Sequence, residues 1–293
     1  MQLEACKHRS VSMEAIQRAN IPDNFSRMGH NSSQLLRSSD IKLFNISNYL
    51  PHLFLISIWQ RQTRVKAIYQ NCKTTTTEKM NFIRKHWYDV GGLISILILT
   101  IVYKHFKDLS DYQVVMWLSL VSLLFHQLEE YRIVGTFPGM VNRVMYNSDL
   151  PDRFPLNTNT SVYVNVLVGW TTYFLAAFFA EKAIWLGIAT ILISLGNIIA
   201  HTIVFNIKGK TIYNAGLATS WLFFAPGIFF FFSIIHKENL ATSLDYFIGI
   251  PLGVVLNVVG ILKLIDWCAD KNTKYIFEQR NLLPQDKKTR ANN

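Results

Sequence analysis

Charged residues are scarce in this chain of 293 residues. Asp, Glu, Lys and Arg together make up 16% of it, and half of all residues are apolar. Soluble globular chains usually have about a quarter of their residues charged. The deficit argues against an ordinary soluble domain, and the apolar content excludes disorder for the body of the chain.

Cysteine is also rare. The three cysteines are Cys6, Cys72 and Cys268, and no two of them form a CxxC pair. A disulfide framework or a cysteine-rich zinc site needs more cysteines at closer spacing. Both classes are therefore excluded.

The positive charge, +10 in total, is unevenly distributed. Residues 1–79 contain 11 Lys and Arg against 5 Asp and Glu, which leaves a net charge of only +4 for residues 80–293. The later basic residues sit in short loops between apolar runs, which is typical of the flanks of membrane spans. We therefore expect the lipid bilayer as a partner, and no nucleic acid.

A compositional break at Met80 divides the chain. Residues 1–79 lack long uncharged runs and the apolar core of a secretory signal peptide, and they contain too many acidic residues for a typical transit peptide. We expect them to be an unstructured extension that is dispensable, with Met80 as a functional start. Residues 80–267 would form a transmembrane domain, and residues 268–293 a polar cytoplasmic tail.

Six apolar runs after Met80 are long enough to cross a bilayer as helices, which takes about 20 residues. Membrane strands alternate in polarity, and these runs do not. The sequence thus predicts an all-α, polytopic membrane helix bundle with about six transmembrane helices. The runs are 89–106, 112–130, 161–180, 183–205, 215–235 and 244–265.

The flanking basic residues predict the orientation of these spans. Ten Lys and Arg flank one side and four flank the other, and the richer side is normally cytoplasmic. With six spans, both termini then lie in the cytoplasm. The four on the other side are Lys104, Lys107, Lys182 and Lys237.

The second run ends in a cluster of ionisable residues, His126, Glu129 and Glu130. Positions i, i+3 and i+4 share one face of a helix, so these side chains can converge. Two carboxylates near hydrocarbon are costly unless they are paired, hydrated or bound to a cation. The plain alternative is a helix end at which both glutamates reach water.

The fourth run ends with Asn197 and His201, one helical turn apart. The second and fourth helices run in the same direction, so their ends lie at matching depth. We therefore expect this pair to meet the His126/Glu129/Glu130 cluster in one cavity, with Arg132 or a metal as further compensation for the carboxylates. Asn214, ahead of the fifth run, is a plausible helix cap.

These residues resemble a known family. His126-Gln127-Leu128-Glu129-Glu130 looks like the motif of the HXXEE domain family, whose members are integral membrane proteins, mostly bacterial. A later Asn and His are expected there, as in Asn197 and His201, and Tyr213-Asn214-Ala215-Gly216 is similar to a further stretch of the family. The resemblance implies a membrane-embedded enzyme, in a bacterial plasma membrane, without naming a substrate.

A metal-dependent enzyme is the first functional hypothesis. His126, Glu130 and His201 would hold a divalent ion, zinc or iron, because two His and one carboxylate suit both. Glu129 would serve as general base, and Asn197 would orient His201 or the substrate. The substrate would be lipid-like or amphipathic.

Two other classes stay open. In an enzyme without metal, His126 and the glutamates would move protons on a lipid or isoprenoid, as an acid/base isomerase. In a small proton-coupled transporter, Glu129, Glu130 and His201 would relay protons. A lipid-binding membrane protein is a further alternative. The sequence does not indicate an oligomeric state.

Overall fold

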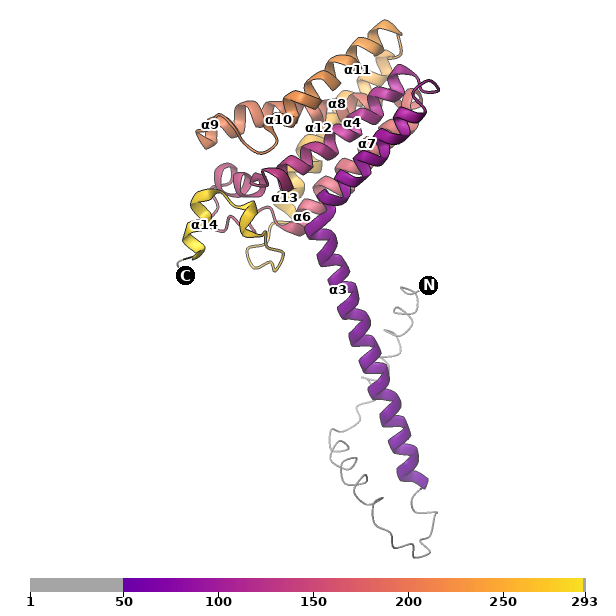
Figure 1. Ribbon diagram of the computed structural model, residues 1–293, viewed down its shortest axis with the longest axis vertical. Helices are drawn as coiled ribbons and strands as arrows, with labels where there is room; N and C mark the ends of the chain where they lie inside the picture. The colour runs from indigo at the N-terminus through magenta and orange to yellow at the C-terminus, as the bar shows by residue number, and fades with distance from the viewer. Residues whose placement is uncertain (1–49, 292–293) are drawn as a thin grey trace, which may run out of the picture. The chain divides into compact units, whose positions relative to one another are not determined.

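The computed structural model describes residues 50–291, and all their regular elements are helical (Figure 1). The α-helices are α3 (Leu50–Lys104), α4 (Asp111–Leu128), α5 (Phe137–Gly139), α6 (Thr158–Val162), α7 (Thr171–Phe179), α8 (Ile184–Ile199), α9 (Phe205–Gly209), α10 (Leu217–Thr219), α11 (Ala225–Lys237), α12 (Ser243–Val255), α13 (Leu264–Trp267) and α14 (Pro284–Ala291). The prediction of an all-α fold is confirmed for the described residues.

Short π-helical and 3₁₀ segments continue many of these helices. The π-helical segments are η2 (Glu129–Ile133), η3 (Met140–Met145), η4 (Tyr163–Trp170), η6 (Ala200–Val204), η7 (Ser220–Phe224) and η8 (Leu256–Lys263). The 3₁₀ segments are η5 (Ala180–Ala183) and η9 (Gln279–Asn281). Two of the π-helical segments, η2 and η6, contain candidate site residues, and such segments often occur at functional sites.

The chain divides into two compact units, residues 1–82 and residues 83–293. The division falls close to the compositional break at Met80. Residues 50–79 form the first part of helix α3, so the predicted unstructured extension is corrected there. Residues 1–49 lie outside the described residues.

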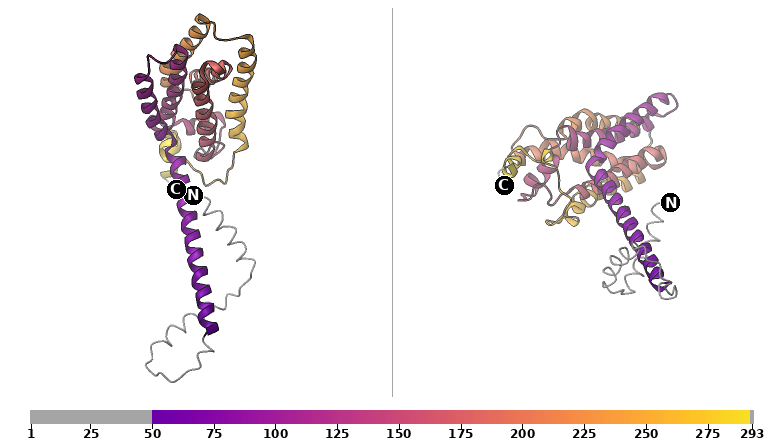
Figure 2. Two further views of the ribbon diagram at one scale, coloured as in Figure 1. Left: turned by 90° about the vertical axis from the view of Figure 1, so that its right-hand side faces the viewer. Right: turned by 60° about the horizontal axis from the view of Figure 1, so that its bottom comes forward.

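In the second unit, α4, α7, α8, α11 and α12 lie side by side as a helix bundle (Figures 1 and 2). Buried apolar side chains such as Tyr112, Met116, Ile188 and Phe231 fill the space between them. Many large apolar side chains on the outer faces are exposed, among them Phe247. Such a surface suits lipid, because hydrocarbon does not penalise exposed apolar groups.

Four stretches are long and apolar enough to cross a membrane: Met80–Lys104, Thr158–Gly209, Leu217–Lys237 and Ser243–Trp267. The chain is thus suited to a membrane, but the predicted six spans are not confirmed. Two differences explain why four stretches are found where six spans were predicted. The stretch Thr158–Gly209 combines the third and fourth runs, which meet at Ala180, where φ is +46°. The second run, α4, begins with Asp111 and ends in His126 and Gln127, so it is less apolar than the four stretches, although it continues into η2.

The C-terminal segment is not a simple polar tail. Phe277, Leu282 and Leu283 are buried, and the Asn281 amide donates hydrogen bonds to the Tyr131 and Gly135 carbonyls at 3.2 and 2.8 Å. The predicted tail, residues 268–293, is therefore corrected. Its described part packs against the segment that follows α4.

Candidate metal centre

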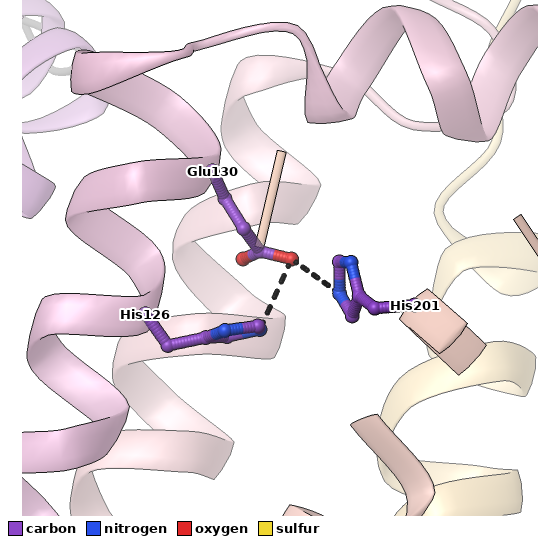
Figure 3. A group of neighbouring side chains, drawn as sticks. All are labelled: His126, Glu130 and His201. Carbon is purple, nitrogen blue, oxygen red and sulfur yellow. Dashed lines mark ion pairs between the residues drawn. The ribbon is translucent and has the colours of Figure 1, made fainter. Parts of the chain in front are cut away.

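Three of the predicted site residues converge in the second unit (Figure 3). His126 lies in the last turn of α4, Glu130 in η2 and His201 in η6. The Nε2 atoms of His126 and His201 lie 3.4 and 3.3 Å from the same Glu130 oxygen, Oε1. All three side chains are buried, and their potential ligand atoms lie within 4.8 Å of one another.

Thr219 determines the tautomer of His126, that is, which ring nitrogen carries the proton and which one presents a lone pair to Glu130. The Thr219 hydroxyl donates its proton to Glu129 Oε2 at 2.5 Å, so toward His126 it can only accept. It lies 2.9 Å from His126 Nδ1, which must therefore be protonated. In the neutral imidazole, Nε2 then presents a lone pair toward Glu130. Consistent with this, His126 Nε2 is buried without a hydrogen bond.

An asparagine orients His201 in the same way. The Asn214 amide nitrogen donates to the backbone carbonyl of His201 and to the side-chain oxygen of Asn206, both at 2.8 Å. These two bonds assign the orientation of the Asn214 amide. Its oxygen, Oδ1, then faces His201 Nδ1 at 2.6 Å and accepts from it. His201 Nε2 is thus also left with a lone pair toward Glu130. Asn214 does not cap the helix with its side chain as predicted, since Gly216 occupies the N-cap position.

Glu129 is held away from this cluster, at the start of the helical stretch that begins at Leu217. Its carboxylate accepts from the backbone N–H groups of Thr219 at 2.8 Å and Ala218 at 3.4 Å. The Tyr213 hydroxyl donates to it at 2.7 Å. A helix N-terminus stabilises an anion, so these bonds explain how Glu129 tolerates burial. The geometry does not fit the predicted general base, because the carboxylate is committed to structural hydrogen bonds.

Gly216 closes the cluster from the side of this loop. Its φ is +104°, and a Cβ atom there would lie 2.8 Å from both His126 Cε1 and His201 Nδ1. Only glycine can adopt this backbone conformation and leave room for both imidazoles. The loop Tyr213–Thr219 therefore supplies a partner to His126, His201 and Glu129, whereas Glu130 faces the two histidines.

Two other predicted partners lie elsewhere. The Asn197 amide nitrogen donates to the Ile193 carbonyl at 2.9 Å, and the ring nitrogen of His201 is held by Asn214 instead. The predicted role of Asn197 in orienting His201 is therefore corrected. Arg132 pairs with Asp89 at 2.7 Å rather than with either glutamate of the site.

A cavity of about 70 Å³ adjoins the cluster. Its polar lining residues include His126, Glu130, Asn197, Gln127 and Asn165. The Gln127 amide nitrogen donates to Asn165 at 3.1 Å, and the Trp170 indole donates to Gln127 at 2.6 Å. Asn197 thus lines a cavity with His126 and Glu130, whereas Glu129 and His201, which were expected in the same cavity, are not among its lining residues.

Sequence analysis missed Thr219, Gln127 and Asn165. Thr219 follows the glycine of the Tyr213-Asn214-Ala215-Gly216 stretch by three residues, and a hydroxyl at the start of a long apolar run is a weak signal for a site. Gln127 lies between the motif residues, and Asn165 is an amide inside an apolar run. An amide within a span commonly joins helices, so its position alone does not distinguish the two roles.

The geometry defines a class: an all-helical protein, suited to a membrane, with a buried His/Glu/His cluster. A family model described as "Protein of unknown function with HXXEE motif" matches residues 117–231. The chain thus contains an HXXEE domain over these residues, which confirms the resemblance. The match includes all three clustered residues and the loop Tyr213–Thr219. No curated protein and no solved structure matches the chain.

Proposed function

We propose that this protein is a membrane-embedded enzyme that uses a divalent metal ion, held by His126, Glu130 and His201, to act on a lipid-like or amphipathic substrate. The observation that supports the ion most strongly is the direction of the two imidazoles. Both Nδ1 atoms donate outward, so both Nε2 lone pairs face one carboxylate oxygen in a buried volume.

Such an arrangement is unfavourable without a positive charge at its centre. Three electron-rich atoms face one another, and burial removes the water that would otherwise separate them. A metal ion turns this repulsion into coordination, because neutral imidazole and carboxylate are its usual ligands. The outward hydrogen bonds resemble the way in which a partner commonly holds the second nitrogen of a metal-binding histidine.

Two histidines and one carboxylate are a ligand set for zinc in hydrolases or for iron in oxygenases, with positions left for water and substrate. An ion of this kind would polarise a substrate oxygen or activate water. The cavity next to His126 and Glu130 offers the space for that substrate group. We propose hydrolysis as the reaction class.

A second candidate function, an enzyme without metal, needs only a proton. One imidazole could be protonated and form an ion pair with Glu130, since both Nε2 distances, 3.4 and 3.3 Å, permit this. An acid/base isomerase without metal would use such a pair. The two hypotheses differ in metal content, which can be measured without knowledge of the substrate.

The test is elemental analysis of the purified full chain, with zinc and iron determined per mole of protein. We expect about one ion per chain in the wild type and strong loss in His126→Ala and His201→Ala. His236→Ala is the matched control, because His236 is exposed at the end of α11. A wild type that contains no metal and takes up neither zinc nor iron(II) would overturn the proposed ion.

We also propose six spans, with both termini on the cytoplasmic side of a bacterial plasma membrane. Support comes from the hairpin at Ala180–Ala183, which separates α7 from α8, and from the packing of α4 against α7 and α11. The basic residues of the loops support the orientation. A reporter fused after Lys182 should be active only outside the cytoplasm. Cytoplasmic activity there would overturn the topology.

A further inference from the structure

We infer that the cavity beside the cluster binds the terminal hydroxyl group of a single-chain apolar molecule, whose chain extends toward the bilayer. This inference deepens the proposed function and rests on it for the position of the hydroxyl oxygen. The cavity, its polar groups and its walls are features of the described residues themselves.

One residue that lines the cavity, Asn197, offers an acceptor oxygen that has no donor among residues 50–291. The Asn197 amide nitrogen donates to Ile193, which assigns the amide orientation. Among residues 50–291, no group donates a hydrogen bond to Asn197 Oδ1. The second oxygen of Glu130 forms neither of the two ion pairs drawn in Figure 3. Acceptor oxygens on two of the lining residues, Asn197 and Glu130, favour a ligand that brings its own proton on oxygen or nitrogen.

A hydroxyl fits these acceptors better than an ammonium group. A metal ion at the cluster would repel a second cation, whereas a hydroxyl oxygen can approach the ion while its proton is donated to Asn197. The amide nitrogens that line the cavity already donate, those of Asn197 and Gln127 once each and that of Asn165 twice. Asn165 donates to Tyr131 and to the Ser161 carbonyl, at 3.2 and 2.9 Å. A carbonyl ligand without a proton would therefore leave Asn197 Oδ1 unpaired.

The size of the cavity limits what can enter. Its volume of about 70 Å³ is roughly half that of an engineered cavity of about 150 Å³ that binds benzene. About three non-hydrogen atoms can be accommodated, which is a hydroxyl and the first carbons of a chain. The rest of a longer molecule must lie outside.

The walls of the cavity indicate where that chain would lie. Val168 of η4 and Ile261 of η8 line the cavity, and the two segments pack against each other. The adjacent residues Leu167 and Leu262 are 64% and 49% exposed. A single layer of helices therefore separates the cavity from the surface that would face lipid, and the chain of the ligand would reach the bilayer by passing between η4 and η8.

Photolabelling of the full chain in lipid nanodiscs tests the inference. The probe is a 16-carbon primary alcohol with a diazirine near its hydroxyl end, and the control probe is its methyl ether. We expect saturable labelling of peptides around Leu123–Gln127 and Val164–Gly169, removed by excess hexadecanol. The ether, which has no proton to donate, should label these peptides much less. Equal labelling by both probes, or labelling that does not saturate, would overturn the inference.

Variants distinguish the cavity from the lipid surface. Asn197→Leu removes the acceptor and should weaken the alcohol about tenfold, the value of one hydrogen bond. Gly169→Leu should block labelling, because a Cβ there would meet Leu123 and Gln127 at ordinary contact distances, 3.5 and 3.6 Å, so that the rest of the side chain fills the cavity. Gly227→Leu is the control, since a Cβ at Gly227 meets nothing within 4 Å. Unchanged labelling in both cavity variants would contradict the site.

Failure of this inference and failure of the proposed function give different results. The labelling is repeated after metal removal with a chelator, and metal content is measured on the same samples. A chain that binds metal but shows no alcohol-specific label keeps the proposed ion and loses the hydroxyl ligand. Specific labelling in a chain that never binds metal keeps the hydroxyl site and removes the ion.

Discussion

Thr219 donates two hydrogen bonds to the same oxygen of Glu129, one from its hydroxyl at 2.5 Å and one from its backbone N–H at 2.8 Å. The hydroxyl proton of Thr219 is thereby engaged with Glu129, and the lone pairs of the Thr219 hydroxyl oxygen face His126 Nδ1. A carboxylate outside the cluster thus orients a histidine inside it. Glu129 acts as a positioning residue through Thr219.

Replacement of Thr219 by valine should weaken metal binding. Valine keeps the shape of the side chain but cannot accept from His126 Nδ1, so the imidazole is no longer held in the required orientation. Loss of such a partner typically lowers metal affinity about 10- to 100-fold. Zinc affinity can be measured by competition with a chromophoric chelator. Thr219→Ser, which restores the hydroxyl, should bind nearly as well as the wild type, and equal loss in both variants would contradict the role of the hydroxyl.

Glu130→Gln should separate the metal hypothesis from the proton hypothesis. If an ion occupies the cluster, added zinc should raise the unfolding temperature of the wild type but not that of the variant, because the substitution removes the carboxylate ligand. If Glu130 instead only pairs with a protonated imidazole, zinc should change neither temperature, and the substitution should cost about 3–5 kcal/mol, since it leaves a buried charge unpaired. The measurement is thermal or denaturant unfolding with added zinc and with a chelator.

Gly216→Ala should destabilise the fold and disturb the cluster together. The added methyl group would contact both imidazoles, and the φ of +104° is unfavourable for alanine. Backbone strain of about 1–3 kcal/mol and overpacking of a similar size are expected. Gly227→Ala, which meets open space, should leave both the unfolding temperature and the metal content unchanged. A Gly216→Ala variant with wild-type values for both would refute the close packing.

The C-terminal segment should contribute to stability through Asn281. This buried amide donates to two backbone carbonyls of the segment after α4, so Asn281→Ala leaves both without that donor. A cost of about 1–3 kcal/mol is expected for such buried polar groups. Asn272→Ala is the control, because Asn272 is exposed. If both variants unfold at the wild-type temperature, the segment does not stabilise the fold.

The sequence by itself determined the helical class and the two histidine positions of the cluster. Long apolar runs predict helices for a membrane, and an i, i+4 spacing places His126 and Glu130 on one helix face. His126 and His201 were predicted to meet because the second and fourth runs end at the same depth. The clustering of their ligand atoms within 4.8 Å agrees with that argument.

Only the tertiary structure decided which residues orient the histidines and which groups hold Glu129. The residues that orient the histidines, Asn214 and Thr219, come from a loop and from the start of a helix, where the sequence has no hydrophobic periodicity that would predict their positions. Their effect depends on hydrogen-bond direction, and direction is a property of packed side chains that spacing along the chain does not contain.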